Sequence, residues 1–78
     1  MEDTISIDIQ EASQVELLYL RHNAPRGMWK MVEIRTGKSR SQVHYQIMQM
    51  PNNQDLEIIQ AAREILFAVT GLKYELSH

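Results

Sequence analysis

The chain has 78 residues, of which 44% are hydrophobic and 23% charged, a composition typical of one small globular domain and not of a disordered or fibrous chain. It contains no cysteine, which excludes disulfides and thiolate chemistry and favours a reducing compartment. The longest apolar run, residues 65 to 69, is too short to cross a bilayer, and the acidic start of the chain is unlike a secretory signal. We therefore expect a cytoplasmic protein.

The formal net charge of −2 is unevenly distributed along the chain. Residues 1 to 20 contain five acidic side chains and no lysine or arginine, whereas residues 21 to 50 contain six basic side chains and one acidic side chain. A basic segment between acidic ends is the asymmetry expected of a surface that faces phosphates. A solvated basic loop would have the same composition, so charge alone leaves both interpretations open.

Residues 1 to 12 are predicted to form an amino-terminal arm in front of a domain that spans residues 13 to 78. Residues 4 to 10 alternate between apolar and polar side chains, which is the period of a half-buried strand. So short a segment is equally compatible with a loose arm.

Two helices are predicted in the first half of the domain. Ser13 and Glu16 fit a capping box, in which each side chain accepts a hydrogen bond from the other residue's backbone amide, and this starts a helix at about residue 14. Pro25 ends that helix near residue 22. A second helix is predicted over residues 28 to 36, because Gly37 can adopt the left-handed conformation that closes a helix.

A third helix is predicted to begin at about residue 40. Ser39 and Gln42 form a second capping box at its start, and Pro51 ends it by residue 50.

The fourth predicted helix begins after Asn52 and Asn53, which we expect to cap it, and ends at Gly71. Asp55 and Glu57 lie in its first turn, where negative charge interacts favourably with the helix dipole. Its apolar residues recur at helical spacing, which predicts a core-facing stripe. The stripe consists of Ile58, Ile59, Ala62, Ile65, Leu66 and Val69.

A competing interpretation places a β-hairpin in the middle of the chain. Residues 30 to 34 and residues 43 to 47 both alternate passably, and a turn between them would give a β-β-β-α domain of the α+β class. Periodicity does not distinguish the helical interpretation from the β-hairpin interpretation in segments this short. The capping box at Ser39 and the helix stop at Gly37 favour an all-α fold, a compact helix-turn-helix domain of about four helices.

The segment Trp29-Lys-Met-Val-Glu-Ile-Arg-Thr-Gly37-Lys-Ser-Arg-Ser-Gln-Val43-His-Tyr-Gln-Ile47 resembles the helix-turn-helix of phage-repressor and LacI-type DNA-binding proteins. More loosely, the resemblance extends through the fourth helix. Two helices that meet at a sharp angle need a residue tolerant of left-handed backbone between them, and Gly37 supplies it. Val32 and Val43 stand where the family places its apolar contact pair.

Two positions depart from the family pattern. Glu33 stands where the family usually has alanine, so its longer side chain would have to bend toward solvent. Lys38 stands where an apolar residue is common.

The resemblance implies sequence-specific binding of double-stranded DNA by a transcriptional regulator, with the amino-terminal turn of the third helix in the major groove. Trp29 is assigned to the core. The resemblance places Arg40, Ser41, Gln42, His44 and Tyr45 against base edges. It places Arg26, Lys30, Lys38 and Ser39 against phosphates.

No catalytic residue, metal site or cofactor is predicted, and the protein is not expected to be an enzyme. The three histidines, His22, His44 and His78, have no metal-ligand spacing, and the two glycines near the middle form no phosphate-binding loop. The alternative function is a small interaction or inhibitor module that binds a protein partner and no DNA.

A homodimer is predicted through residues 56 to 70. Leu56, Ala61, Phe67 and Ala68 lie off the stripe of the fourth helix, and a helix with a second apolar face in so small a chain usually meets a partner. Pairing would also let a two-fold protein contact a two-fold DNA site about 34–36 Å across. Alternatively, Leu17, Leu20 and Trp29 cover both faces within one chain.

Overall fold

A computed structural model describes residues 10–72 and residue 74, and within this part of the chain all regular structure is helical. The predicted all-α class is confirmed, and the competing β-β-β-α interpretation is wrong. Residues 1–9 of the predicted arm lie outside the described residues. The elements are α1 (Gln14–Asn23), α2 (Met28–Thr36), α3 (Arg40–His44), its direct π-helical continuation η1 (Tyr45–Gln49), and α4 (Leu56–Thr70).

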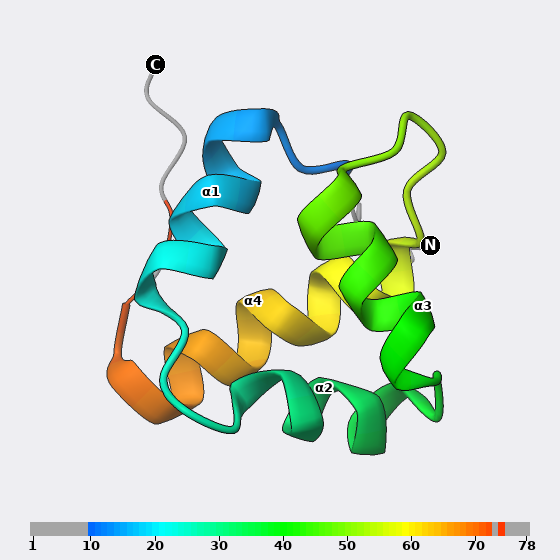
Figure 1. Ribbon diagram of the computed structural model, residues 1–78. Helices are drawn as coiled ribbons and strands as arrows, with labels where there is room; N and C mark the ends of the chain where they lie inside the picture. The colour runs from blue at the N-terminus through cyan, green and yellow to red at the C-terminus, as the bar shows by residue number, and fades with distance from the viewer. Residues whose placement is uncertain (1–9, 73, 75–78) are drawn as a thin grey trace, which may run out of the picture.

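Helix α4 lies behind α1, α2 and α3 in Figure 1 and packs most extensively against α2. Helices α2 and α4 run in opposite directions past each other, while α1 and α3 stand at the two sides of the molecule. The longest helix, α4, therefore forms one layer of the molecule, and α1, α2 and α3 form the other.

The core lies between α4 and this layer. The predicted stripe of α4 is buried at every position except Val69, which is half-exposed. Ala61, which we expected off the stripe, is buried as well. The fully buried large side chains come from every helix: Leu17, Leu20, Met28, Val32, Val43, Ile47, Ile58, Ile59, Ile65 and Leu66.

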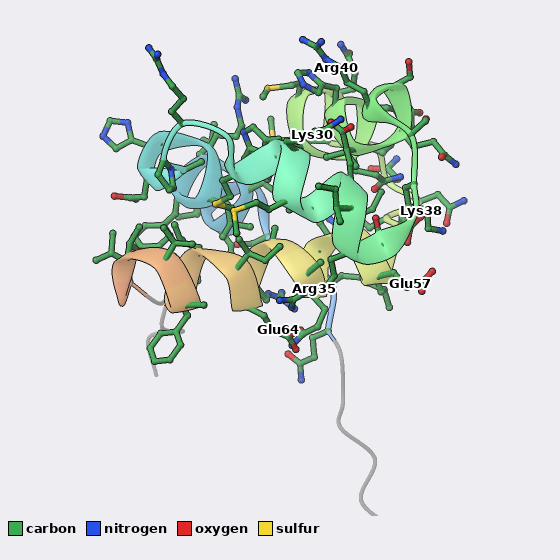
Figure 2. All side chains as sticks on the ribbon, turned by 90° about the horizontal axis from the view of Figure 1, so that it is seen from below. Lys30, Arg35, Lys38, Arg40, Glu57 and Glu64 are labelled. Atoms are coloured by element: carbon green, nitrogen blue, oxygen red, sulfur yellow. The ribbon has the colours of Figure 1, made fainter. Side chains whose placement is uncertain are left out.

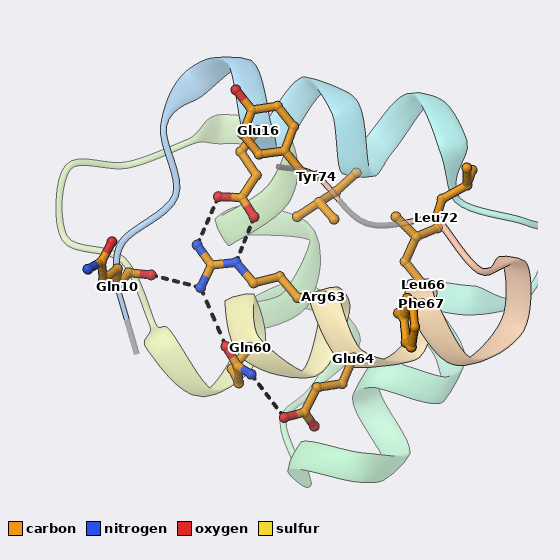
Figure 3. Close-up of a pocket in the computed structure, with 10 residues that line it drawn as sticks. Gln10, Glu16, Gln60, Arg63, Glu64, Leu66, Phe67, Leu72 and Tyr74 are labelled. Carbon is orange, nitrogen blue, oxygen red and sulfur yellow. Dashed lines mark hydrogen bonds and ion pairs between the residues drawn. The ribbon is translucent and has the colours of Figure 1, made fainter. Parts of the chain in front are cut away.

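Two ion pairs join α4 to neighbouring helices. Arg35 of α2 lies 2.9 Å from Glu64 of α4 in an exposed position, and Figure 2 shows the two side chains facing each other. Glu16 of α1 accepts two hydrogen bonds from Arg63, at 2.6 and 2.8 Å, and is only 5% exposed. Arg63 also donates to the backbone carbonyl of Gln10, so that it holds both α1 and the segment before it (Figure 3).

The first predicted capping box is only half formed for this reason. The Ser13 hydroxyl accepts from the Glu16 amide at 3.0 Å, as expected. The Glu16 carboxylate turns to Arg63 and not back to Ser13, because two charge-assisted hydrogen bonds stabilise a buried carboxylate more than one backbone amide does.

The end of the predicted arm is held against the domain. Ala12 is buried, and its backbone N–H and C=O both bond to the side-chain amide of Gln54, at 2.8 and 2.7 Å. Residues 10 to 12 are thus fixed to the loop that precedes α4.

The cap of α4 differs from the prediction. Asp55, not the asparagine pair Asn52–Asn53, is the N-cap, and its carboxylate accepts from the Glu57 amide at 3.1 Å. The buried Gln46 side chain organises this loop: it accepts from the Asp55 amide at 2.8 Å and donates to the Asn53 carbonyl. The N-cap of α4 is therefore held in place by Gln46, which precedes Asp55 by nine positions.

We predict that Glu16→Ala lowers the free energy of unfolding by about 3 kcal/mol, because it leaves the Arg63 guanidinium without its buried partner. Glu64→Ala is the matched control: it also removes a carboxylate bound to an arginine, but an exposed one, and should cost at most about 1 kcal/mol. Urea unfolding followed by far-ultraviolet circular dichroism measures both. Equal losses in the two variants would contradict the assignment of Glu16 as the dominant link between α1 and α4.

Candidate nucleic-acid interface

The α2–α3 unit consists of two helices joined by a short turn, as the sequence predicted. Helix α2 ends at Thr36, three residues form the turn, and α3 rises steeply from it (Figure 1). Gly37 has φ 72° and ψ 12°, the left-handed conformation, and its N–H donates to the Glu33 carbonyl at 2.9 Å. Since no atom lies within 4 Å of a Cβ added there, glycine is needed for the backbone conformation and not for space.

The second capping box is complete. The Ser39 hydroxyl accepts from the Gln42 amide at 3.1 Å, and the Ser39 amide donates to the Gln42 side chain at 2.9 Å. Val32 and Val43 are both fully buried in the core that α2 and α3 share. The start of α3 is therefore fixed by hydrogen bonds at its end and by packing along its side.

The predicted base-contacting residues lie on α3 and the first residue of η1. Arg40, Ser41, Gln42 and Tyr45 are exposed, while His44 is half-buried. Gln42 uses its side-chain oxygen in the capping box, which leaves its amide N–H groups as donors. Arg40 and His44 border a shallow hollow together with three residues of α2, namely Trp29, Lys30 and Glu33.

The basic side chains of this region divide into two groups. Lys30 and Arg40 lie on the side of the molecule away from α4 (Figure 2). Arg35 and Lys38 lie toward α4 and are paired with its acidic residues. Arg26 is exposed at the turn before α2. Lys30 and Arg40 are therefore separated from the acidic residues of α4, whereas the turn before α3 lies beside Asp55 and Glu57.

Lys38 has a structural role that the sequence did not indicate. Its ammonium group lies 3.1 Å from an Asp55 carboxylate oxygen and 3.2 Å from a Glu57 oxygen. The hydrogen bond to Asp55, and after it the one to Glu57, raises the pKa of Lys38 above its usual value. Lys38 fastens the turn to the start of α4, so its position does not favour the predicted phosphate contact.

Glu33 does not bend into solvent as expected. Its side chain is 15% exposed and lies in the hollow, with one carboxylate oxygen 3.8 Å from the Lys30 ammonium. Trp29 is only partly buried, since one part of it packs against the core and another borders the same hollow.

The predicted second apolar face of α4 is much smaller than expected. Ala61 is buried and Leu56 half-buried, which leaves Phe67, Ala68 and Val69 exposed near the end of the helix. Leu17 and Leu20 of α1 are fully buried in the core that they share with α4, as in the alternative of a self-covered helix.

Comparison with protein families, curated proteins and solved structures finds no match. In the described part of the chain, no helix has the length and apolar content needed to span a bilayer, and no three His, Cys, Asp or Glu side chains are grouped to hold a metal ion.

We predict that Lys38→Met reduces stability at neutral pH and that the difference from the unsubstituted protein shrinks as the pH rises above 10.5, the ordinary pKa of lysine. The folded-state pKa is raised, so the stabilisation is fully present below the unfolded value and is lost as the ammonium group deprotonates in the folded protein. Chemical unfolding of both proteins between neutral and strongly alkaline pH measures the difference. A difference that stays constant through that range would mean that Lys38 acts through packing and not through charge.

Proposed function

We propose that the protein binds double-stranded DNA through α3 and acts as a sequence-specific transcriptional regulator in the cytoplasm. The observation that supports this best is the exposed first turn of α3, held by the Gly37 turn and the Ser39 cap on the side of Lys30 and Arg40. A short helix that projects polar side chains from a fixed angle is suited to the major groove. The proposed role is binding, without a catalytic step.

The proposed contacts follow from exposure and chemistry. Arg40 would donate two hydrogen bonds to guanine, and Ser41, His44, Tyr45 and the amide of Gln42 would contact neighbouring base edges. Arg26, Lys30 and Ser39 would contact phosphates and set the register. Lys38 is left out of the proposed phosphate contacts because two carboxylates already hold its charge.

The net charge of −2 does not by itself oppose this proposal, because the acidic residues of α4 lie apart from Lys30 and Arg40, although Glu33 of α2 borders the same hollow as these two cations. Asp55, Glu57 and Glu64 belong to the cap and body of α4, on the side away from Lys30 and Arg40, and are paired with Arg35 and Lys38. Screening over about 8–10 Å at physiological salt further weakens their effect on a phosphate at the opposite face.

We predict that affinity for duplex DNA falls with salt with a log–log slope of about −1.8 per protomer, the value when two cations, Arg26 and Lys30, displace counterions from phosphates. If Arg35 and Lys38 also faced DNA, four cations would give about −3.6. Fluorescence anisotropy with a labelled duplex at several salt concentrations measures the slope. Absence of binding at low salt would refute the DNA proposal and favour a protein-binding module.

Two substitutions test the division between base and phosphate contacts. Arg40→Ala should cost about 1–3 kcal/mol on the preferred duplex, found by selection from a random library, and should relax specificity at one base pair. Lys30→Ala should weaken preferred and random duplexes alike. Lys38→Ala is the control and should leave affinity nearly unchanged. If Arg40→Ala weakened all duplexes equally, α3 would not be the element that contacts bases.

A further inference from the structure

The outer side of the α2–α4 contact exposes large apolar side chains around an ion pair. Met31 and Ile34 of α2 are 44% and 72% exposed, and Phe67 of α4 is 55% exposed. Between them lies the pair of Arg35 and Glu64, which is also about half exposed. We call these five residues the α2–α4 seam.

Helical spacing places these residues on two helix faces that the ion pair joins, with Phe67 at the edge where it also lines a hollow with Leu20 and Arg63. Met31, Ile34 and Arg35 are three or four positions apart and share one face of α2, and Glu64 and Phe67 likewise share one face of α4. The two helices run in opposite directions. Met31, which precedes Arg35 on α2, and Phe67, which follows Glu64 on α4, therefore lie toward the same end of the helix pair. The ion pair at 2.9 Å brings these two faces together.

The composition of the seam is that of a protein interface. Methionine, phenylalanine and arginine are enriched at the centres of such contacts, and a group of exposed large apolar side chains marks a binding surface. Its charges indicate which partner fits. A cation and an anion side by side are self-complementary under a two-fold rotation, which sets Arg35 against the partner's Glu64 and Glu64 against the partner's Arg35.

We propose that the seam joins two copies of this chain in a two-fold dimer. This surface differs from the contact predicted over residues 56 to 70, of which it uses only Glu64 and Phe67. The ion pair, shared between the copies, becomes a four-charge cluster surrounded by Met31, Ile34 and Phe67 of each copy.

The proposed dimer rests on the proposed DNA-binding function, because its role would be to present two α3 helices to one duplex. In Figure 2 Arg35 and Glu64 of the seam lie beside α4, while Lys30 and Arg40 lie on the side of the molecule away from α4. A two-fold axis that passes through the seam toward the side of Lys30 and Arg40 would leave both α3 helices directed to the same side. Two copies joined in this way can contact two half-sites of one duplex.

A charge-exchange experiment tests the seam without DNA. Arg35→Glu and Glu64→Arg each create like charges across the two-fold axis and should weaken self-association by about 100-fold. An equimolar mixture of the two variants should associate again, because the two acidic groups in the seam of one variant then face the two basic groups in the seam of the other. Sedimentation equilibrium on the full chain, at concentrations up to about 1 mM, measures each case.

Ile34→Glu is a second test, because this side chain is the most exposed of the seam and its replacement leaves the core intact. It should also dissociate the dimer. Val15→Glu is the matched control, since Val15 is an equally exposed apolar residue on α1, outside the seam, and should leave association unchanged. Circular dichroism confirms that each variant is folded.

An unsubstituted chain that is monomeric at about 1 mM would overturn the dimer, and a dimer that tolerates Ile34→Glu would overturn the seam as its contact. Failure of the mixed variants to associate would also exclude the cross-chain ion pairs. These outcomes are distinct from failure of the DNA proposal, which is measured by anisotropy and can occur with the dimer intact.

Discussion

Burial of α4 is the interaction on which the other features of the molecule depend. Four large side chains of this helix, Ile58, Ile59, Ile65 and Leu66, are almost completely removed from solvent, and each such burial contributes about 1.5–3 kcal/mol. A chain of 78 residues has little other core to draw on, so α1, α2 and the α3–η1 segment must all pack against the same helix. The exposed sides of α2 and α3 are what remains after that packing, and the proposed binding surfaces consist of them.

The acidic residues of α4 then determine which cations stay available. Asp55 and Glu57 hold Lys38, and Glu64 holds Arg35, so these two cations of the α2–α3 region serve the fold. The charge of Lys38 has a structural role, since its ionic contacts join the turn to the start of α4. Lys30 and Arg40 lie on the opposite side of the molecule.

Signals confined to a few neighbouring residues predicted the fold well. Gly37 and the Ser39–Gln42 capping box located the turn and the start of α3, because both act through backbone groups within three or four positions. Features that depend on distant residues were not predictable in this way. The Glu16 carboxylate bonds to a residue 47 positions away, and Asp55 becomes the cap of α4 because Gln46 holds its amide. No local pattern distinguishes these residues from other polar residues.

The candidate interface shows the same limit for individual side chains. The sequence predicted that Arg40, Ser41 and Tyr45 are exposed on the third helix, and they are exposed on α3 and η1, since helix boundaries and spacing are enough to find an exposed face. It could not separate Lys30 from Lys38, because only the folded structure brings acidic groups of α4 within reach of Lys38. Lys30, in the first turn of α2, lies away from α4 and beside Glu33. Charge counted along the chain therefore overstates the basic surface of this protein. The effective surface is what remains after each cation is paired in three dimensions, and this remainder, not the net charge, determines how strongly a phosphate is attracted.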